Sequence, residues 1–147
     1  MEMKHTYTFK GIPKNVLWDT IQDQDVLKKV LPGCDVFKEV EENVYEASLN
    51  INMGPVKGKF SSDVKQVDME EPDFYRLLVK ASGKPGEIDA DAAMSFEETD
   101  EGTVLTCNAT VNVTGLLASV GQRIMGGVAK VVIGQFFKDI EKEANKM

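Results

Sequence analysis

The C-terminal stretch of this chain, residues 116–146, constrains the fold more than any other part of the sequence. It reads LLASVGQRIMGGVAKVVIGQFFKDIEKEANK, contains no proline, and repeats aliphatic residues at steps of three and four. This spacing is typical of an amphipathic helix. At about 1.5 Å per residue, a helix over this stretch would be roughly 45 Å long. The pattern therefore predicts one long helix that can cross a whole sheet.

Two features of this predicted helix bear on function. The apolar side of its first half is centred near Leu117 and Ile124, whereas in its second half it moves toward Phe136 and Phe137. The two halves should therefore face different surroundings. Four glycines also lie inside the stretch, and each would cost about 1 kcal/mol relative to alanine if exposed. A bend, close packing on a sheet, or space for a ligand would account for Gly121, Gly126, Gly127 and Gly134.

Length and charge bound the class of protein. The chain has 147 residues, which is enough for one domain with its own core, and we expect a single domain over 1–147. The formal net charge of -7 and the lack of a basic stripe argue against nucleic acid as a partner. Arg123, Lys130 and Gln135 interrupt the C-terminal helix, so it is not predicted to span a membrane.

The N-terminus and the cysteines indicate the compartment. Residues 1–5 lack the apolar segment of a signal peptide. Cys34 and Cys107 lie far apart without a metal-type spacing, and we expect both to be reduced. The prediction is a cytoplasmic protein.

Alternation and turn residues predict the elements before the C-terminal helix. Residues 3–9 alternate like a half-buried strand, and two short helices follow, the second with Asp25 as its expected N-cap. From Cys34 to Val113, turn residues separate six further strands. Consecutive hairpins form an antiparallel sheet, and only the last helix is long enough to cover its concave face. The predicted α+β fold is a helix-grip arrangement. A curved seven-stranded antiparallel sheet wraps around the long C-terminal helix, with two short helices between strands 1 and 2.

The covered face of this sheet carries many short side chains. Of 24 inward positions from the third strand to the last, eight are Ala, Gly, Ser or Cys, and none is acidic or basic. On the fourth strand this inward set ends at Val64. Because protein interiors are closely packed, the missing volume predicts either close approach of the helix or an open apolar cavity. The expected cavity lining is Leu49, Ile51, Phe60, Tyr75, Leu77, Met94, Phe96, Ile124, Val128, Val131 and Val132.

Few side chains on that face could take part in chemistry. His5 and Tyr45 are the expected polar contacts to a ligand, and an ordinary packing role is the alternative for each. The acidic residues gather near strand ends and turns. Nothing in the sequence resembles a metal cluster, a phosphate loop, or a nucleophile paired with a base. We therefore expect no catalytic residue, no metal and no cofactor.

Several motifs together resemble the CoxG family of carbon monoxide dehydrogenase subunits. The likeness runs over nearly the whole chain, and the order of the motifs is more specific than any one of them. The motifs are VLWDTIQD at 16–23, LPGC at 31–34, GPVKGKF at 54–60, the turn at 83–86 and GLLASVGQRIMGGVAKVVIGQFF at 115–137.

The resemblance implies a START-like and Bet v 1-like fold with a hydrophobic cavity. It also implies a non-catalytic, accessory role beside molybdenum-containing carbon monoxide dehydrogenases or related hydroxylases. That role would be membrane recruitment or the handling of a lipid or quinone. Many members continue into a hydrophobic tail, whereas this chain stops at Met147. At most a peripheral or transient contact with the inner face of the membrane is expected.

Three classes of function remain open. The first is a binding module that holds a lipophilic molecule and presents it to an oxidoreductase or a membrane. The second is a cofactor-free enzyme of the cyclase or hydrolase-like helix-grip type, with His5, Tyr45 and Tyr75 as its candidate acids or bases. The third is a protein–protein adaptor with a solid interior.

Overall fold

The chain folds into one strand, two short helices, six strands and a C-terminal helical segment. The computed structural model describes residues 1–146. This order confirms the predicted α+β fold. The elements are β1 (Glu2–Lys10), α1 (Lys14–Gln22), α2 (Gln24–Val30), β2 (Cys34–Glu41), β3 (Val44–Met53), β4 (Val56–Glu70), β5 (Phe74–Gly83), β6 (Gly86–Thr99), β7 (Gly102–Val113), the 3₁₀ helix η1 (Gly115–Val120) and α3 (Gln122–Ala144).

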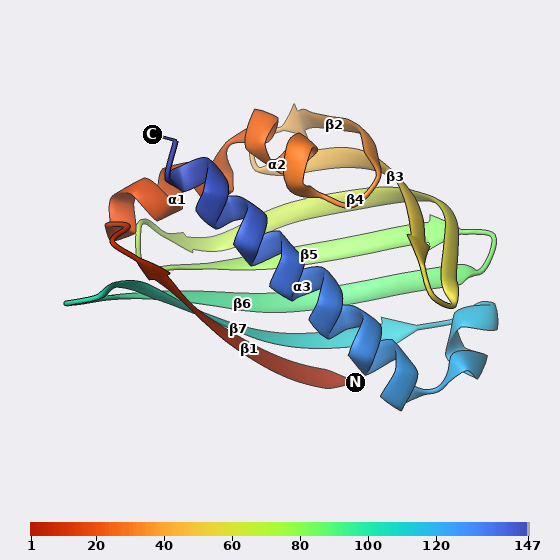
Figure 1. Ribbon diagram of the computed structural model, residues 1–147. Coiled ribbons are helices and arrows are strands. Elements are labelled where there is room, and N and C mark those ends of the chain that lie inside the picture. The colour runs from red at the N-terminus through yellow and green to blue at the C-terminus, as the bar shows by residue number, and fades with distance from the viewer. Residues whose placement is uncertain (147) are drawn as a thin grey trace.

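The strands form one antiparallel sheet of seven strands in the order β1-β7-β6-β5-β4-β3-β2. Strands β2 to β7 follow one another as hairpins, and β1 pairs with β7 at the other edge. Figure 1 shows the curved sheet, with α3 crossing one face diagonally and α1 and α2 near its C-terminal end. Side chains alternate between the two faces of a strand. The register therefore places the predicted inward residues together on the face toward α3.

The short helices close one end of the sheet. The Trp18 ring on α1 lies 5.4 Å from the Tyr75 ring and 5.3 Å from the Phe96 ring. The cap of α2 differs from the prediction. It is Asp23, whose carboxylate accepts hydrogen bonds from the backbone N–H groups of Asp25 at 2.8 Å and Val26 at 3.2 Å. The chain is still extended at Asp23, so its side chain reaches the free N–H groups of the first turn.

The C-terminal segment departs from the predicted single helix. Residues 115–120 form η1, and Gly121 separates it from α3 with a φ of 96°. This φ is readily accessible only to glycine, so a bend explains Gly121. Close packing does not explain Gly127 or Gly134. A Cβ added at Gly127 or Gly134 would meet no atom within 4 Å.

Two hydrophobic clusters join the helices to the sheet. The first, at the α1 end, includes Phe9, Trp18, Tyr75 and Phe137. The second, at the other end, consists of Val56, Phe60, Ala81, Leu117 and Met125. Leu117 and Met125 stand on either side of Gly121, so the bend lets η1 and α3 contribute to the same cluster.

No helix among residues 1–146 combines the length and the apolar character needed to cross a bilayer.

Candidate ligand-binding site

The inward face of the sheet is incompletely covered between the two clusters. Val64 on β4 pairs with Val79 on β5, which pairs with Ala90 on β6. These three residues, which we call the open strip, are only half-buried and belong to neither cluster. Residues in the middle of a covered sheet are normally closely packed. Their partial exposure therefore means that α3 does not close over them.

Short side chains flank the open strip. Ala47, Ser62 and Ala81 stand side by side in the next row across β3, β4 and β5. Ala92 on β6 belongs to the row on the other side and is half-buried. The short inward residues noted in the sequence therefore surround the least covered part of the sheet.

The structure divides the predicted lining residues into three groups. The aromatic and sulfur-containing ones are buried inside the clusters, namely Phe60, Tyr75, Met94 and Phe96. Five aliphatic ones are half-buried on the sheet or on α3 and stay candidate ligand contacts, namely Leu49, Ile51, Leu77, Val128 and Val132. The last two, Ile124 and Val131, are exposed.

Ile124 and Val131 correct the sequence prediction. Their exposed fractions are 53% and 60%, and they lie about 120–140° around α3 from the buried Phe137. The prediction of one continuous helix aligned Ile124 with Leu117. Because Gly121 breaks that helix, Leu117 enters the second cluster while Ile124 faces solvent.

The two predicted polar contacts already have packing neighbours. The half-buried His5 ring lies 5.6 Å from the Phe137 ring. Tyr45 stacks on Phe37 at 5.1 Å. Burial raises the pKa of Tyr45, and the nearby Glu39 carboxylate raises it further. A contact of either residue with a ligand stays a prediction.

The buried titratable side chains Tyr75 and Cys107 are both uncharged. Burial raises the pKa of Tyr75, and it raises the pKa of Cys107 to about 11. Both groups are therefore neutral at physiological pH, as an apolar environment favours.

Two polar side chains interrupt the inward face of β4. Ser62 and Gln66 are 4% and 6% exposed, and they lie on either side of Val64 in the alternation. The predicted inward set ended at Val64 and did not include Gln66. The signal was present, since Phe60, Ser62, Val64 and Gln66 continue the period of two through the 15-residue strand β4.

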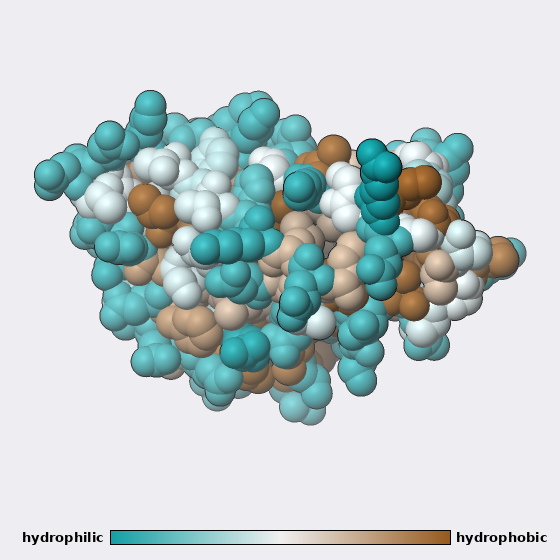
Figure 2. Space-filling model, turned by 90° about the horizontal axis from the view of Figure 1, so that it is seen from below, coloured by the Kyte–Doolittle hydropathy of each residue, from teal (hydrophilic) through white to brown (hydrophobic). Residues whose placement is uncertain are grey.

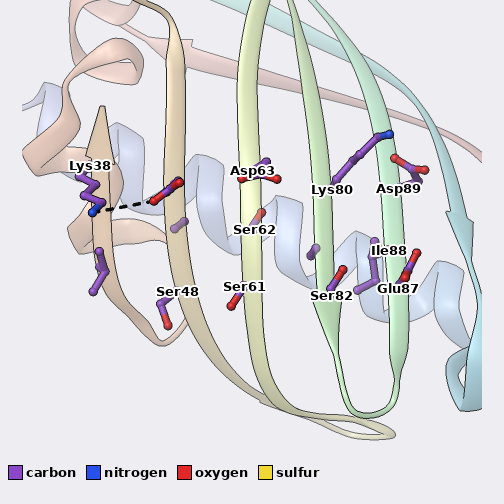
Figure 3. Close-up of a pocket in the computed structure, with 14 residues that line it drawn as sticks. Lys38, Ser48, Ser61, Ser62, Asp63, Lys80, Ser82, Glu87, Ile88 and Asp89 are labelled. Carbon is purple, nitrogen blue, oxygen red and sulfur yellow. Dashed lines mark ion pairs between the residues drawn. The ribbon is translucent and has the colours of Figure 1, made fainter. Parts of the chain in front are cut away.

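A separate hollow of about 610 Å³ lies on the outer face of the sheet. Figure 3 shows this face, with α3 behind the strands. Its lining includes the row Ser48, Ser61 and Ser82 and a row of mixed charge, Lys38, Glu46, Asp63, Lys80 and Asp89. Lys38 and Glu46 form an exposed ion pair of 3.8 Å there. This is the solvated face of the sheet, whereas the predicted apolar lining belongs to the opposite face.

The structure of residues 1–146 contains no candidate metal-binding site. Within residues 1–146, no three His, Cys, Asp or Glu side chains gather as a possible metal site.

The architecture defines the class of protein first. A curved antiparallel sheet with a C-terminal helix across one face is the Bet v 1-like helix-grip fold. The crystal structure of Ara h 8.0201 superposes with a TM-score of 0.72 at 15% identity, covering 100% of this chain and 99% of that one. The Zhui aromatase/cyclase from Streptomyces sp. R1128 superposes with a TM-score of 0.68 at 12% identity, covering 99% and 94%. At such identities the likeness shows the fold alone.

A family model then places the chain more closely. Residues 11–145 match the model of the carbon monoxide dehydrogenase subunit CoxG, and the chain belongs to this family. A conserved protein from Geobacillus kaustophilus is 34% identical, with a TM-score of 0.95 and coverage of 99% of this chain and 96% of that one. No sequence among the curated proteins matched.

Proposed function

We propose that this protein is a non-catalytic accessory protein that binds a hydrophobic small molecule between its sheet and α3. The open strip of Val64, Val79 and Ala90 carries this proposal. Those side chains are apolar, inward and only half-buried. Exposed apolar surface inside a fold favours a lipophilic occupant. An adaptor with a solid interior would instead have Ala90 and Ala92 covered by helix side chains, and both are half-buried.

The chemistry of the inward face favours a lipid or a quinone. Apart from Glu98 near the end of β6, whose carboxylate accepts a hydrogen bond from the Lys14 backbone N–H, none of the inward positions from Tyr45 to Val113 carries a carboxylate, lysine or arginine. A charged ligand would lose its hydration there without gaining a counter-ion. The name of the family supports a carbon monoxide dehydrogenase as partner. The proposed partner is of the molybdenum-hydroxylase type, and the bound molecule would be presented to it.

An enzyme of the aromatase/cyclase kind is the second candidate, because such proteins share the fold. The candidate acids and bases argue against it. The His5 ring packs on Phe137, and burial and the nearby Glu39 carboxylate raise the pKa of Tyr45. Burial raises the pKa of Tyr75. A general acid or base works best with a pKa near the working pH and a free path to substrate.

A surface beside the site supports peripheral membrane contact. Leu116, Ile124 and Val131 are exposed, Arg123 and Lys130 are exposed among them, and no acidic residue occurs between 115 and 138. Figure 2 shows brown hydrophobic side chains near the end of the molecule where η1 and the start of α3 lie. Apolar side chains beside cations are suited to an anionic lipid surface. This fits a cytoplasmic protein that visits the inner face of the membrane.

The first test is extraction of the purified protein with organic solvent, followed by mass spectrometry. A mock purification from cells lacking the protein is the control. A stoichiometric quinone or lipid is the expected result. A clean extract, repeated after incubation of the protein with ubiquinone-1, would contradict the proposal.

A second test places the ligand. Trp18 is the single tryptophan of the chain, so quenching of its fluorescence by ubiquinone-1 reports binding. Ala90→Leu should fill the open strip and weaken binding at least tenfold. Ala93→Leu is the matched control, because it makes the same change on the outer side of the same strand. Equal loss in both variants would show that the ligand does not occupy the open strip.

A further inference from the structure

Two buried polar side chains beside the open strip lack partners within residues 1–146. The Oγ atom of Ser62 is buried without a hydrogen bond to any described residue. Gln66 is 6% exposed, and its side-chain amide, which makes no hydrogen bond to a described residue, is not completely buried as the Ser62 hydroxyl is. The Gln66 backbone N–H donates to the carbonyl of Asn43 at 2.9 Å. Buried polar groups in proteins are nearly always paired, because an unpaired one loses its bonds to water without replacement.

Ser62 is buried, and the side chains directly beside it are short. Its neighbours across the sheet are Ala47 on one side and Ala81 on the other. No side chain longer than a methyl group therefore stands beside it in this row. Gln66 is two positions beyond Val64 on the same face, next to the half-buried Leu77. The two polar groups thus flank the open strip at its β4 end.

We propose that Ser62 and Gln66 are polar anchors that select a neutral, mainly apolar ligand carrying a carbonyl or hydroxyl oxygen. A serine hydroxyl and a glutamine amide can both donate to a carbonyl, and both can accept from a hydroxyl. Neither can neutralise a carboxylate, and the inward positions of β3 to β7 supply no cation. Fatty acids and other anions are therefore disfavoured, and pure hydrocarbons leave both anchors unpaired. This inference rests on the proposed function.

Three probes of similar size separate these chemistries. They are 2-acetylnaphthalene, which carries a carbonyl, 2-ethylnaphthalene, which is a hydrocarbon, and 2-naphthoate, which is an anion. Equilibrium dialysis against the whole protein measures their affinities. We expect the ketone to bind most tightly and the anion least. Equal affinity for all three would overturn the inference.

Substitutions test whether Ser62 and Gln66 cause the preference for the ketone. Ser62→Ala and Gln66→Leu should each weaken binding of 2-acetylnaphthalene roughly three- to tenfold, the effect of one lost hydrogen bond. Binding of 2-ethylnaphthalene should not weaken. Ser61→Ala is the matched control, since Ser61 is exposed on the opposite face of β4, and it should change neither affinity.

The outcomes distinguish this inference from the proposed function. If wild type binds the ketone and the hydrocarbon but the variants keep the same ratio of affinities, the assignment of the anchors is wrong, while the proposed binding site between the sheet and α3 stands. If wild type binds no probe, the proposed function fails and the anchors fail with it.

Unfolding without ligand adds a readout that does not depend on binding. The unfolding midpoint in urea should stay equal or rise in Ser62→Ala, because an unpaired buried hydroxyl is removed. A lowered midpoint would show that Ser62 has a structural role, which contradicts the assignment.

Discussion

The two halves of α3 differ in how far their apolar side chains are buried. In the C-terminal half, Phe137 and Ile140 are completely buried, and the Glu141 carboxylate accepts a hydrogen bond of 2.7 Å from the Tyr7 hydroxyl. In the N-terminal half, Met125 is the buried anchor, whereas Ile124 and Val131 are exposed. The helix is thus fixed at one end by a closed aromatic core. At the other end it leaves apolar surface available for a ligand or a membrane.

The largest effect should come from the buried half. Phe137→Ala should lower the free energy of unfolding by about 3–5 kcal/mol, because it empties the core between β1 and α3. Ile124→Ala in the exposed half should change it by less than about 0.5 kcal/mol. Urea unfolding followed by circular dichroism measures both. Similar losses in the two variants would contradict the division of α3.

A smaller loss is expected from the anchor of the N-terminal half. Met125→Ala should cost about 2–3 kcal/mol, because the second cluster is small and its neighbours can partly fill the gap. The same urea titration applies, with Ile124→Ala as its exposed control. A loss as large as that of Phe137→Ala would mean that both ends of α3 are equally fixed.

The hydrogen bond from Tyr7 should contribute less, and its contribution should depend on pH. Tyr7→Phe should cost about 1 kcal/mol at neutral pH. Burial, followed by the hydrogen bond to Glu141, raises the pKa of Tyr7 from its ordinary value of 10.0 to about 12. The stabilisation is therefore fully present below pH 10 and is lost as the pH rises toward 12, since the unfolded chain releases its proton first. Unfolding of both proteins across this range should show the difference between them shrinking. A constant difference would show that Tyr7 is not held as a neutral donor.

The helix glycines should give the smallest effects. Gly127→Ala and Gly134→Ala should each stabilise the protein by about 0.5–1 kcal/mol, because alanine favours the helix and the added Cβ meets nothing within 4 Å. Gly121→Ala is the contrasting control, since a φ of 96° strains any other residue and should lower stability. Thermal melting measures all three. A loss in Gly134→Ala would show a contact that the open surroundings do not provide.

Local patterns predicted most of the fold. Strict alternation, as in Tyr75, Leu77, Val79 and Ala81, reports which side chains share a face. Hairpin turns such as Gly54-Pro55 order consecutive strands in the sheet. Alternation and turn residues each involve only a few neighbouring residues, so both can be recognised in the sequence without knowledge of long-range contacts.

The candidate site could be predicted only in part. The half-buried aliphatic residues on the inward face followed from alternation. Ile124 and Val131 did not, because one positive φ at Gly121 changes the direction of everything after it. Gln66 was missed because polarity alone does not tell an exposed position from a buried position without a partner.

The sequence by itself determined the strand and helix order, the faces of the strands and an interior without charge, because these depend on spacing and residue type. Only the tertiary structure decided which inward residues are sealed and which remain open. Burial depends on where α3 crosses the sheet, and that position results from the bend at Gly121 together with two clusters formed by residues far apart in the chain. The lack of partners at Ser62 and Gln66 among the described residues is likewise a property of the assembled surroundings, since a polar side chain is unpaired only when everything around it is in place.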